Sequence, residues 1–285
     1  MNPLFDRVTI AGAGLLGASL GLAMQARGLA RHITGVGRRQ SSLEKALARG
    51  TVHTVTLDLA AAAADADLIV VATPAGAVTG ALDTIRHAAA ENAIVIDVAS
   101  TKGSICAHAR SLWKAPRRFI GCHPMAGSEK SGPEHATPHL YEGSVCLVET
   151  GPDLDVEARA QVLRLWEAIG ARVIGVDPDH HDALLARTSH VPHIIAAALA
   201  LVAAREGATC DFIGNGFRDT TRIAAGSPEM WRDITLTNGP AIAGGLRAVQ
   251  RQIDAFLDAV DRQDPDALLD LFNAGKSARE SVLAE

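Results

Sequence analysis

Two residues in the N-terminal half of the chain have types and positions that suit proton and hydride chemistry. Ser100 and His123 each follow a short apolar run of the kind that forms a buried strand. A histidine at the carboxyl end of a strand, flanked by Gly and Pro, can accept the proton of a hydroxyl while its carbon gives up a hydride. The alternative is a structural histidine, and both interpretations stay open at this point.

Two further polar clusters lie in the C-terminal part. Ser189 and His193 are four residues apart in an apolar helical stretch, so they share one helix face. His190 and His193 could hold a metal in principle, but no glutamate partner or third ligand is nearby, and no metal site is predicted. In segment 215–222, Arg222 stands beside hydroxyls and a carboxylate. That composition suits either recognition of a carboxylate or a salt-bridged loop.

A glycine-rich turn near the N-terminus predicts a bound dinucleotide. The sequence G-x-G-x-x-G follows the apolar run 8–11 directly and opens a helical stretch. Its first glycine allows the tight turn, the second lets the backbone approach a pyrophosphate, and the third lets helix and strand pack closely. The expected cofactor contacts in and beyond this turn are Gly12, Gly14, Leu15, Leu16, Gly17, Thr73, Pro74 and Ser100.

Two arginines stand where an NAD site usually has an acidic residue. About 20 residues past the turn, the position that binds the ribose hydroxyls holds Gly37, which Arg38 and Arg39 follow. Arginine suits a 2′-phosphate through charge-assisted bonds, so the sequence favours NADP over NAD. The other interpretation is that both arginines are solvated surface charges and that either cofactor is used.

An α/β domain would bring these residues together. Before residue 176, nearly continuous apolar runs alternate with helical stretches, which predicts a largely parallel sheet covered on both faces. Ligands bind beyond the carboxyl ends of such strands, so Ser100 and His123 should lie on the same rim as the nicotinamide. The expected strands are 8–11, 33–36, 68–72, 94–98, 118–122, 144–148 and 172–176, and the expected helices are about 15–29, 41–49, 75–90, 102–113 and 155–169.

After Val176 the strand signal ends and helical patterns follow. One helix is expected from about 180 to 206 with a kink at Pro192, a second over 239–261, and a third from Pro265 toward Val282. We therefore predict a Rossmann-type NAD(P)-binding domain at 1–176 and an all-helical substrate and dimerisation domain at 177–285. The apolar stripes of the long helices fit a homodimer interface or core within the chain.

Composition excludes several classes of protein. Hydrophobic residues make up 48% and charged residues 21% of the 285 residues, as in soluble globular chains. No apolar run approaches the roughly 20 residues of a membrane helix, and a net charge of −5 gives no electrostatic reason for nucleic-acid binding. The four cysteines lack metal-ligand spacing, and no secretory signal is visible. A cytoplasmic protein with reduced thiols is expected.

In combination, these segments resemble the prephenate/arogenate (cyclohexadienyl) dehydrogenase family of tyrosine biosynthesis over essentially the whole chain. The resemblance rests on residues 12–17, 97–103, 123–132, 189–193, 216–224 and 230–233. It implies an NAD(P)-dependent oxidative decarboxylation of prephenate or arogenate, which gives 4-hydroxyphenylpyruvate or tyrosine. Both substrates remain candidates.

The resemblance also implies roles for single residues around the reacting ring. By position, His123 matches the catalytic histidine that accepts the proton of the ring hydroxyl. Ser100 matches the serine that bonds to this hydroxyl and orients the nicotinamide. Arg222 matches the arginine that binds a substrate carboxylate. Glu129 matches an acid in a gating ion network near that arginine, and Ser128 is counted with it among the substrate-binding residues.

Three more positions are assigned to substrate binding by the same resemblance. His193 and Ser189 match residues near the substrate side chain. Trp231 is expected to reach the active site of the partner subunit, because the helical domains of the family form an intertwined homodimer.

Two other functions compete with this interpretation. A two-domain dehydrogenase of the β-hydroxyacid or pyrroline-carboxylate reductase type would share the fold. The β-hydroxyacid type relies on a lysine in its helical domain, and here that domain has only Lys276. A non-catalytic NADP-binding sensor would keep residues 12–17 but would not need His123, Ser100 and Arg222 together.

Overall fold

A computed structural model of the chain describes residues 2–127, 130, 132–207 and 209–284. The contacts within it divide the chain into two units, residues 1–238 and 239–285, which are described separately. The predicted domain boundary at 176 stays a prediction. The helices that follow it, up to residue 238, belong to the same unit as the strands.

A six-stranded parallel sheet forms the centre of the first unit, in the order β3-β2-β1-β4-β5-β6. Its strands are β1 (Phe5–Ala11), β2 (Ala30–Val36), β3 (Thr54–Thr56), β4 (Leu68–Val71), β5 (Ile94–Asp97) and β6 (Phe119–Ile120). β4 and β5 are buried at every position, as expected of strands covered on both faces. The strand order reverses between β1 and β4, and ligands of such sheets bind beyond the carboxyl ends of the strands at this point.

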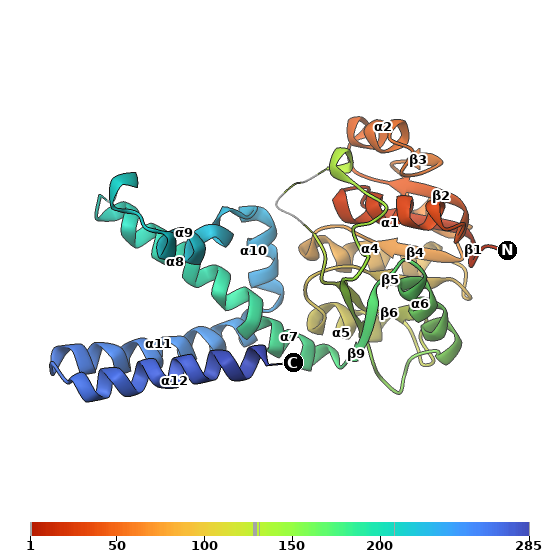
Figure 1. Ribbon diagram of the computed structural model, residues 1–285. Helices are drawn as coiled ribbons and strands as arrows, with labels where there is room; N and C mark the ends of the chain where they lie inside the picture. The colour runs from red at the N-terminus through yellow and green to blue at the C-terminus, as the bar shows by residue number, and fades with distance from the viewer. Residues whose placement is uncertain (1, 128–129, 131, 208, 285) are drawn as a thin grey trace. The chain divides into compact units, whose positions relative to one another are not determined.

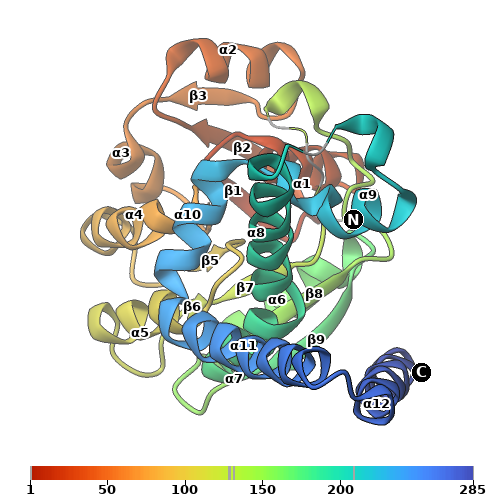
Figure 2. The same ribbon diagram turned by 90° about the vertical axis from the view of Figure 1, so that its left-hand side faces the viewer.

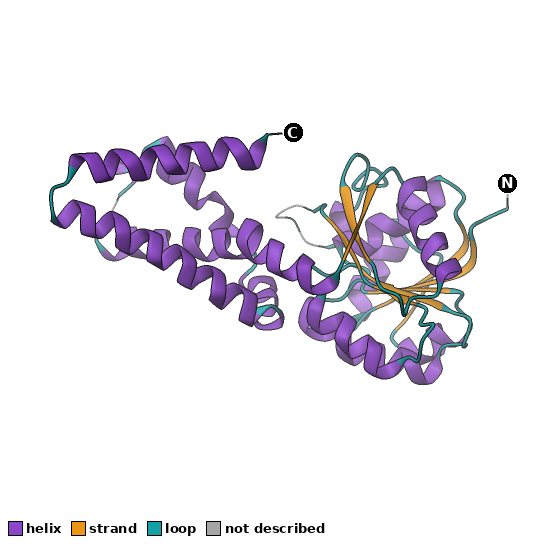
Figure 3. Ribbon diagram, turned by 90° about the horizontal axis from the view of Figure 1, so that it is seen from below, coloured by secondary structure: helices purple, strands orange, loops and turns teal. Residues whose placement is uncertain are grey.

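Helices cover both faces of this sheet (Figure 2, Figure 3). They are α1 (Leu15–Ala26), α2 (Gln40–Ala48), α3 (Leu59–Ala64), α4 (Ala75–Ala88), α5 (Gly103–Leu112) and α6 (Val156–Ala168). Leu20 of α1 and Trp166 of α6 belong to one buried apolar cluster. Leu82 of α4 and Ile105 of α5 belong to the other. The Rossmann-type arrangement predicted for this part of the chain is confirmed.

The expected strand 118–122 is wrong as a single element, because the chain changes sheets at Gly121. β6 ends at Ile120, and β7 (Cys122–Pro124) begins a second sheet in the order β7-β8-β9, with β8 (Val145–Glu149) and β9 (Arg172–Val176). β7 and β8 are antiparallel. The backbone N–H of Gly121 donates to the Glu149 carboxylate at 3.0 Å and that of Cys122 to Asp97 at 3.3 Å, so side chains replace the strand partner here.

Two short elements, β3 and α3, were not expected from the sequence. A three-residue strand is too short to show a period, and α3 lies in an alanine run with no apolar-polar alternation. The Asp58 side chain caps α3 by accepting the N–H of Ala61 at 3.0 Å.

The long helix expected over 180–206 is interrupted just before Pro192. Figure 1 shows its parts as α7 (Pro178–Leu185) and α8 (Val191–Arg205). Between them the residues 186–190 form a π-helical turn. Proline has no N–H to donate to the preceding turn, which favours such a widening. After α8 follow α9 (Asn215–Thr221), a 3₁₀ turn (Arg222–Ala225) and α10 (Pro228–Thr237).

Segment Pro178–Arg205 is the one helical stretch, among the residues that the structure describes, that is long and apolar enough to cross a membrane. It also carries His181, Asp182, His190 and His193, which are buried. The first three hydrogen-bond to other side chains of the first unit. These buried polar contacts argue against a membrane span.

The second unit is a pair of helices, α11 (Gly239–Asp261) and α12 (Pro265–Leu283). The Asp264 side chain caps α12 by accepting the N–H of Ala267 at 3.0 Å, and Pro265 occupies the first turn. Phe256 and Phe272 contact each other across the pair, with ring centroids 5.1 Å apart. These bounds agree with the helices expected from the sequence.

Candidate active site

The glycine turn after β1 has the shape that a dinucleotide needs. Gly12 has a φ of +105°, and a Cβ there would lie 2.4 Å from the carbonyl oxygen of Ala72. A Cβ on Gly17 would lie 2.1 Å from the carbonyl oxygen of Gly12. Gly14 is different, because the space around its missing Cβ is open. The first and third glycines are therefore required by the turn itself, and the second leaves room for a ligand.

Two other observations fit a dinucleotide at this edge. Helix α1, which begins at Leu15 beside Leu16, has no side-chain cap and no acidic residue in its first turn. Its N–H groups can therefore bind a pyrophosphate. At the end of β4, the Thr73 hydroxyl is buried without a hydrogen-bond partner among the described residues. A buried hydroxyl without a partner costs free energy unless a ligand binds it.

The remaining predicted cofactor contacts lie at the same ends of the strands. Pro74 immediately precedes α4. Arg38 and Arg39 follow β2, and both side chains are exposed. Arg39 immediately precedes α2. Their exposure leaves both guanidinium groups available to a ligand.

Ser100 lies in a loop that a buried ion pair fixes. Asp97 at the end of β5 pairs with Lys102, and both side chains are at most 1% exposed. Asp97 also accepts the N–H groups of Ala99 at 3.0 Å and of Cys122 at 3.3 Å. Burial raises the pKa of Asp97, and Lys102 partly offsets this rise. The Asp97 carboxylate thus ties the half-buried Ser100 loop to the start of the strand that carries His123.

His123 lies in β7 with 8% of its surface exposed. Its Nδ1 is 2.9 Å from Nε2 of His181, a fully buried residue of α7. Burial, followed by the neighbouring His181, holds the pKa of His123 well below its usual value. His123 is therefore neutral at neutral pH, as a general base must be.

His193 and Trp231 form a stacked pair between α8 and α10. Their ring centroids are 3.5 Å apart at an interplanar angle of 17°, and Trp231 also meets the edge of His190 at 6.2 Å. A Cβ on Gly226 would lie 2.7 Å from Nε1 of Trp231, so only glycine fits beside the pair. Burial lowers the pKa of His193. The placement of Trp231 in a partner's active site stays a prediction, and within this chain its neighbour is His193.

Arg222 and Ser189 come from segments that adjoin α8. Arg222 begins the 3₁₀ turn that contacts α8, and Ser189 lies half-buried in the π-helical turn. Arg222 is exposed and makes no ion pair with the described residues, so the salt-bridged loop is not found. Ser128 and Glu129 lie outside the described residues.

Helix α10 joins these residues to the nucleotide-binding part. The Thr101 hydroxyl donates to the Thr237 hydroxyl at 3.0 Å. The Asp233 carboxylate faces Gly76 in the first turn of α4, where a Cβ would lie 3.1 Å from it. The loop that carries Ser100 and the helix that carries Trp231 are therefore in direct contact.

Sequence reasoning missed a buried polar cluster around Asp182. Asp182 accepts the N–H groups of Lys102 at 2.7 Å and Gly103 at 2.8 Å, where α5 begins. The Asn238 side chain donates to the backbone oxygen of Asp182 at 2.8 Å and lies 3.2 Å from Nδ1 of His190. The available signal was the polar run 180–182 inside an otherwise apolar helix.

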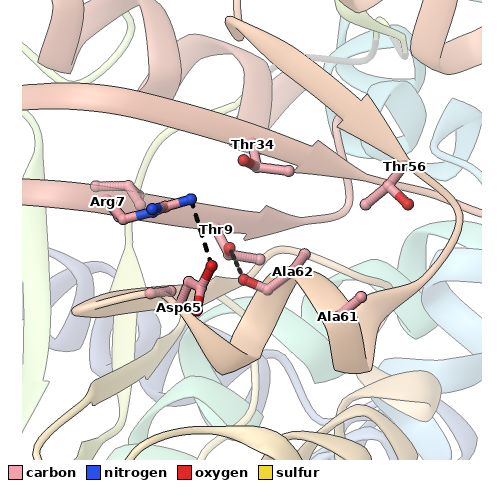
Figure 4. A pocket seen from close by; sticks show the side chains of 9 residues that line it. Arg7, Thr9, Thr34, Thr56, Ala61, Ala62 and Asp65 are labelled. Atoms are coloured by element: carbon pink, nitrogen blue, oxygen red, sulfur yellow. Dashed lines mark hydrogen bonds and ion pairs between the residues drawn. The ribbon is translucent and has the colours of Figure 1, made fainter.

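Two other features of the described residues do not involve the predicted site. Among residues 2–127, 130, 132–207 and 209–284, no three His, Cys, Asp or Glu side chains are grouped to hold a metal. A hollow of about 220 Å³ lies between α3 and the strands β1, β2 and β3 (Figure 4). In this hollow, Arg7 forms an ion pair with Asp65 at 3.5 Å, and the Thr9 hydroxyl donates a hydrogen bond to the carbonyl oxygen of Ala62 at 2.7 Å. None of the predicted site residues lines the hollow.

Comparisons with known proteins cover both parts of the chain. Residues 20–175 match the family described as prephenate dehydrogenase, nucleotide-binding domain, and residues 177–274 match prephenate dehydrogenase, dimerization domain. The prephenate dehydrogenase of Bacillus subtilis (strain 168) is 31% identical over 287 residues, which cover 99% of this chain and 77% of that protein.

Two solved structures extend the similarity to three dimensions. Prephenate dehydrogenase from A. aeolicus, in complex with hydroxyphenyl propionate and NAD+, has a TM-score of 0.89 at 28% identity and covers 97% of this chain and 98% of its own. Synechocystis arogenate dehydrogenase has a TM-score of 0.82 at 29% identity and covers 97% of this chain and 100% of its own.

Proposed function

The chain belongs to the prephenate dehydrogenase family, and from this premise we propose that it oxidatively decarboxylates prephenate or arogenate with NAD(P), giving 4-hydroxyphenylpyruvate or tyrosine in tyrosine biosynthesis. The bound nicotinamide supplies the hydride acceptor. The ring carbon that bears the hydroxyl loses the hydride, the ring carboxylate leaves as carbon dioxide, and the ring becomes aromatic.

The observation that carries this proposal is the neutral, buried His123 beside the carboxyl ends of β5 and β6. Its free nitrogen takes the proton of the ring hydroxyl as the hydride leaves. After decarboxylation the same nitrogen returns the proton to the ring oxygen, so no net proton is consumed. Ser100, in the loop fixed by Asp97, bonds to this hydroxyl and orients the nicotinamide.

Substrate carboxylates need fixed donors in the crevice. In our proposal Arg222, which makes no ion pair with any described residue, binds one carboxylate. His193, held flat against Trp231, lies with Ser189 beside the substrate side chain. Ser128 and Glu129 keep the substrate-binding and gating roles that the resemblance implies.

The base assignment has a direct test in His123→Asn. The variant should bind cofactor and substrate in calorimetric titrations, because it removes the base but no cation. Its turnover should fall by about 10²-fold or more, the usual contribution of general base catalysis. Near wild-type turnover would contradict the assignment of His123 as the general base.

The substrate can be identified by a paired assay of prephenate and arogenate, each with NAD+ and NADP+, following reduced nicotinamide and the aromatic product. Reduction with at least one ring substrate is expected. A β-hydroxyacid is assayed in parallel, and turnover of it without turnover of either ring substrate would favour the first competing function. Cofactor binding without turnover of any of these compounds would favour the sensor.

For the cofactor we propose a preference for NADP, because Arg38 and Arg39 are both exposed at the end of β2. The double variant Arg38→Ala plus Arg39→Ala should raise the Michaelis constant for NADP and leave that for NAD nearly unchanged. An unchanged constant for NADP would show that the arginines are surface charges. We also propose that the protein is cytoplasmic and works as a homodimer.

A further inference from the structure

We propose that His181 and Asp182 are positioning residues that fix which nitrogen of His123 carries its proton. The inference rests on the proposed function, in which His123 is the base. The three side chains form a chain of contacts from α7 to β7. Nδ1 of His123 lies 2.9 Å from Nε2 of His181, and Nδ1 of His181 lies 2.8 Å from Oδ1 of Asp182.

The direction of these hydrogen bonds follows from the surroundings of Asp182. Its two oxygens accept the N–H groups of Lys102 at 2.7 Å and of Gly103 at 2.8 Å. These donors lie at the N-terminus of α5, where a negative charge is favoured. Asp182 is therefore a carboxylate, which only accepts hydrogen bonds, and Nδ1 of His181 must be the donor to it.

The proton on His181 decides the proton on His123. We assign to His181 a single ring hydrogen, on Nδ1, which leaves a lone pair on Nε2. That lone pair accepts a hydrogen bond, so Nδ1 of His123 must carry the hydrogen. The lone pair of His123 is then on Nε2, the nitrogen left over for the substrate hydroxyl. If His181 instead carried its hydrogen on Nε2, Nδ1 of His123 would be the acceptor and no base would remain.

The same contacts keep the His123 ring in place when the reaction charges it. When Nε2 of His123 takes the hydroxyl proton, the imidazolium keeps its Nδ1 hydrogen bond to His181, whose other nitrogen faces the Asp182 carboxylate. In serine proteases a buried aspartate orients the catalytic histidine through a hydrogen bond to Nδ1. Here a second histidine lies between the two groups.

Both positioning residues are fixed by the fold. His181 is fully buried, and its ring meets that of His123 edge-on, with centroids 5.1 Å apart. Asp182 is held from two sides, because Asn238 binds its backbone oxygen at 2.8 Å and α5 binds its carboxylate. Neither the His123 ring nor the His181 ring can turn without breaking a buried hydrogen bond.

Nitrogen-15 NMR of histidine-labelled protein tests the tautomer directly, with the His123 signals assigned by their loss in His123→Asn. In the wild-type protein His123 should carry hydrogen on Nδ1 and a lone pair on Nε2. A hydrogen on Nε2 in the neutral form would overturn the proposal. This outcome does not depend on turnover, so a wild-type protein inactive on both ring substrates would refute the proposed function and leave the tautomer measurement valid.

Turnover of three variants tests whether the tautomer matters. His181→Phe keeps the ring but removes the acceptor, and kcat should fall by about 10²-fold with both Michaelis constants within about twofold of wild type. His181→Gln restores an acceptor and should recover most of the loss. His180→Phe, an exposed position on the same helix, is the control and should behave as wild type. A His181→Phe variant with wild-type kcat would overturn the proposal, and if it fails to fold, the tautomer measurement decides.

Discussion

At the scale of single residues, the proposed chemistry requires that His123 is neutral before it accepts the proton. Burial disfavours the imidazolium, and the folded protein lowers the pKa of His123 well below 6.5. The other titratable or charged groups around it come from four elements and the π-helical turn. They are His181 and Asp182 on α7, Lys102 before α5, Asp97 on β5, Cys146 on β8 and His190 in the π-helical turn.

We predict that kcat/KM is insensitive to pH around neutrality and falls only on strong acidification. The base must be neutral, so the rate is lost as the pH drops through the pKa of His123 in the free enzyme. Since that pKa is depressed, half of the rate should remain at a pH well below 6.5. A profile of kcat/KM against pH, corrected for acid unfolding by circular dichroism, checks this. A midpoint at or above 6.5 would contradict it.

Arg222 offers a second prediction at this scale. Because it is exposed and has no ion pair among the described residues, Arg222→Ala should leave the free energy of unfolding nearly unchanged. Loss of a charge-assisted hydrogen bond of roughly 1.5–3 kcal/mol to a substrate carboxylate should raise the substrate Michaelis constant about 10- to 100-fold. The matched control is Arg205→Ala at the exposed end of α8. An effect of less than threefold would remove Arg222 from the substrate site.

At the scale of elements, local patterns predicted most of the nucleotide-binding part. Apolar runs located β1, β2, β4 and β5, and the glycine spacing located the turn before α1, because each signal lies within one short segment. The strand change at Gly121 left no such signal. It depends on the carboxylates of Asp97 and Glu149, which reach the backbone from 25 and 28 residues away.

The candidate site shows the same difference between local and distant signals. The sequence singled out His123 and the glycines because they stand next to strand ends, and Pro192 indicated the interruption between α7 and α8. The contact of His123 with His181 was not predicted, because 58 residues separate them and the tertiary packing of the chain brings them together. Sequence spacing carries no information on such a contact.

The glycine turn gives a prediction at the element scale. The open space at Gly14, whose φ is −84°, accepts a methyl group without strain. Gly14→Ala should therefore fold with wild-type stability in urea, yet bind the dinucleotide much more weakly, because the methyl occupies the path of the pyrophosphate. Gly80→Ala, also at an open position, is the control within α4. Unchanged cofactor affinity in Gly14→Ala would place the pyrophosphate elsewhere.

At the scale of the whole molecule, the second unit leaves large apolar side chains exposed. It contains two helices, and a pair of this size cannot bury enough apolar surface to be stable alone. Several large apolar side chains on it are more than half exposed: Ile253, Leu257, Val260, Leu269 and Phe272. All five lie within the match to the family's dimerization domain, which covers residues 177–274.

We predict that these side chains form the contact between two copies of the chain. Leu257→Glu with Leu269→Glu should shift the protein from dimer to monomer in sedimentation velocity, because a carboxylate buried in an apolar interface costs several kcal/mol. Arg251→Glu with Ala274→Glu is the control, since helical spacing places these exposed residues on the opposite faces. If Trp231 reaches the partner's active site, the monomer should also lose turnover. A dimer that survives the leucine changes and dissociates in the control would assign the interface to another face.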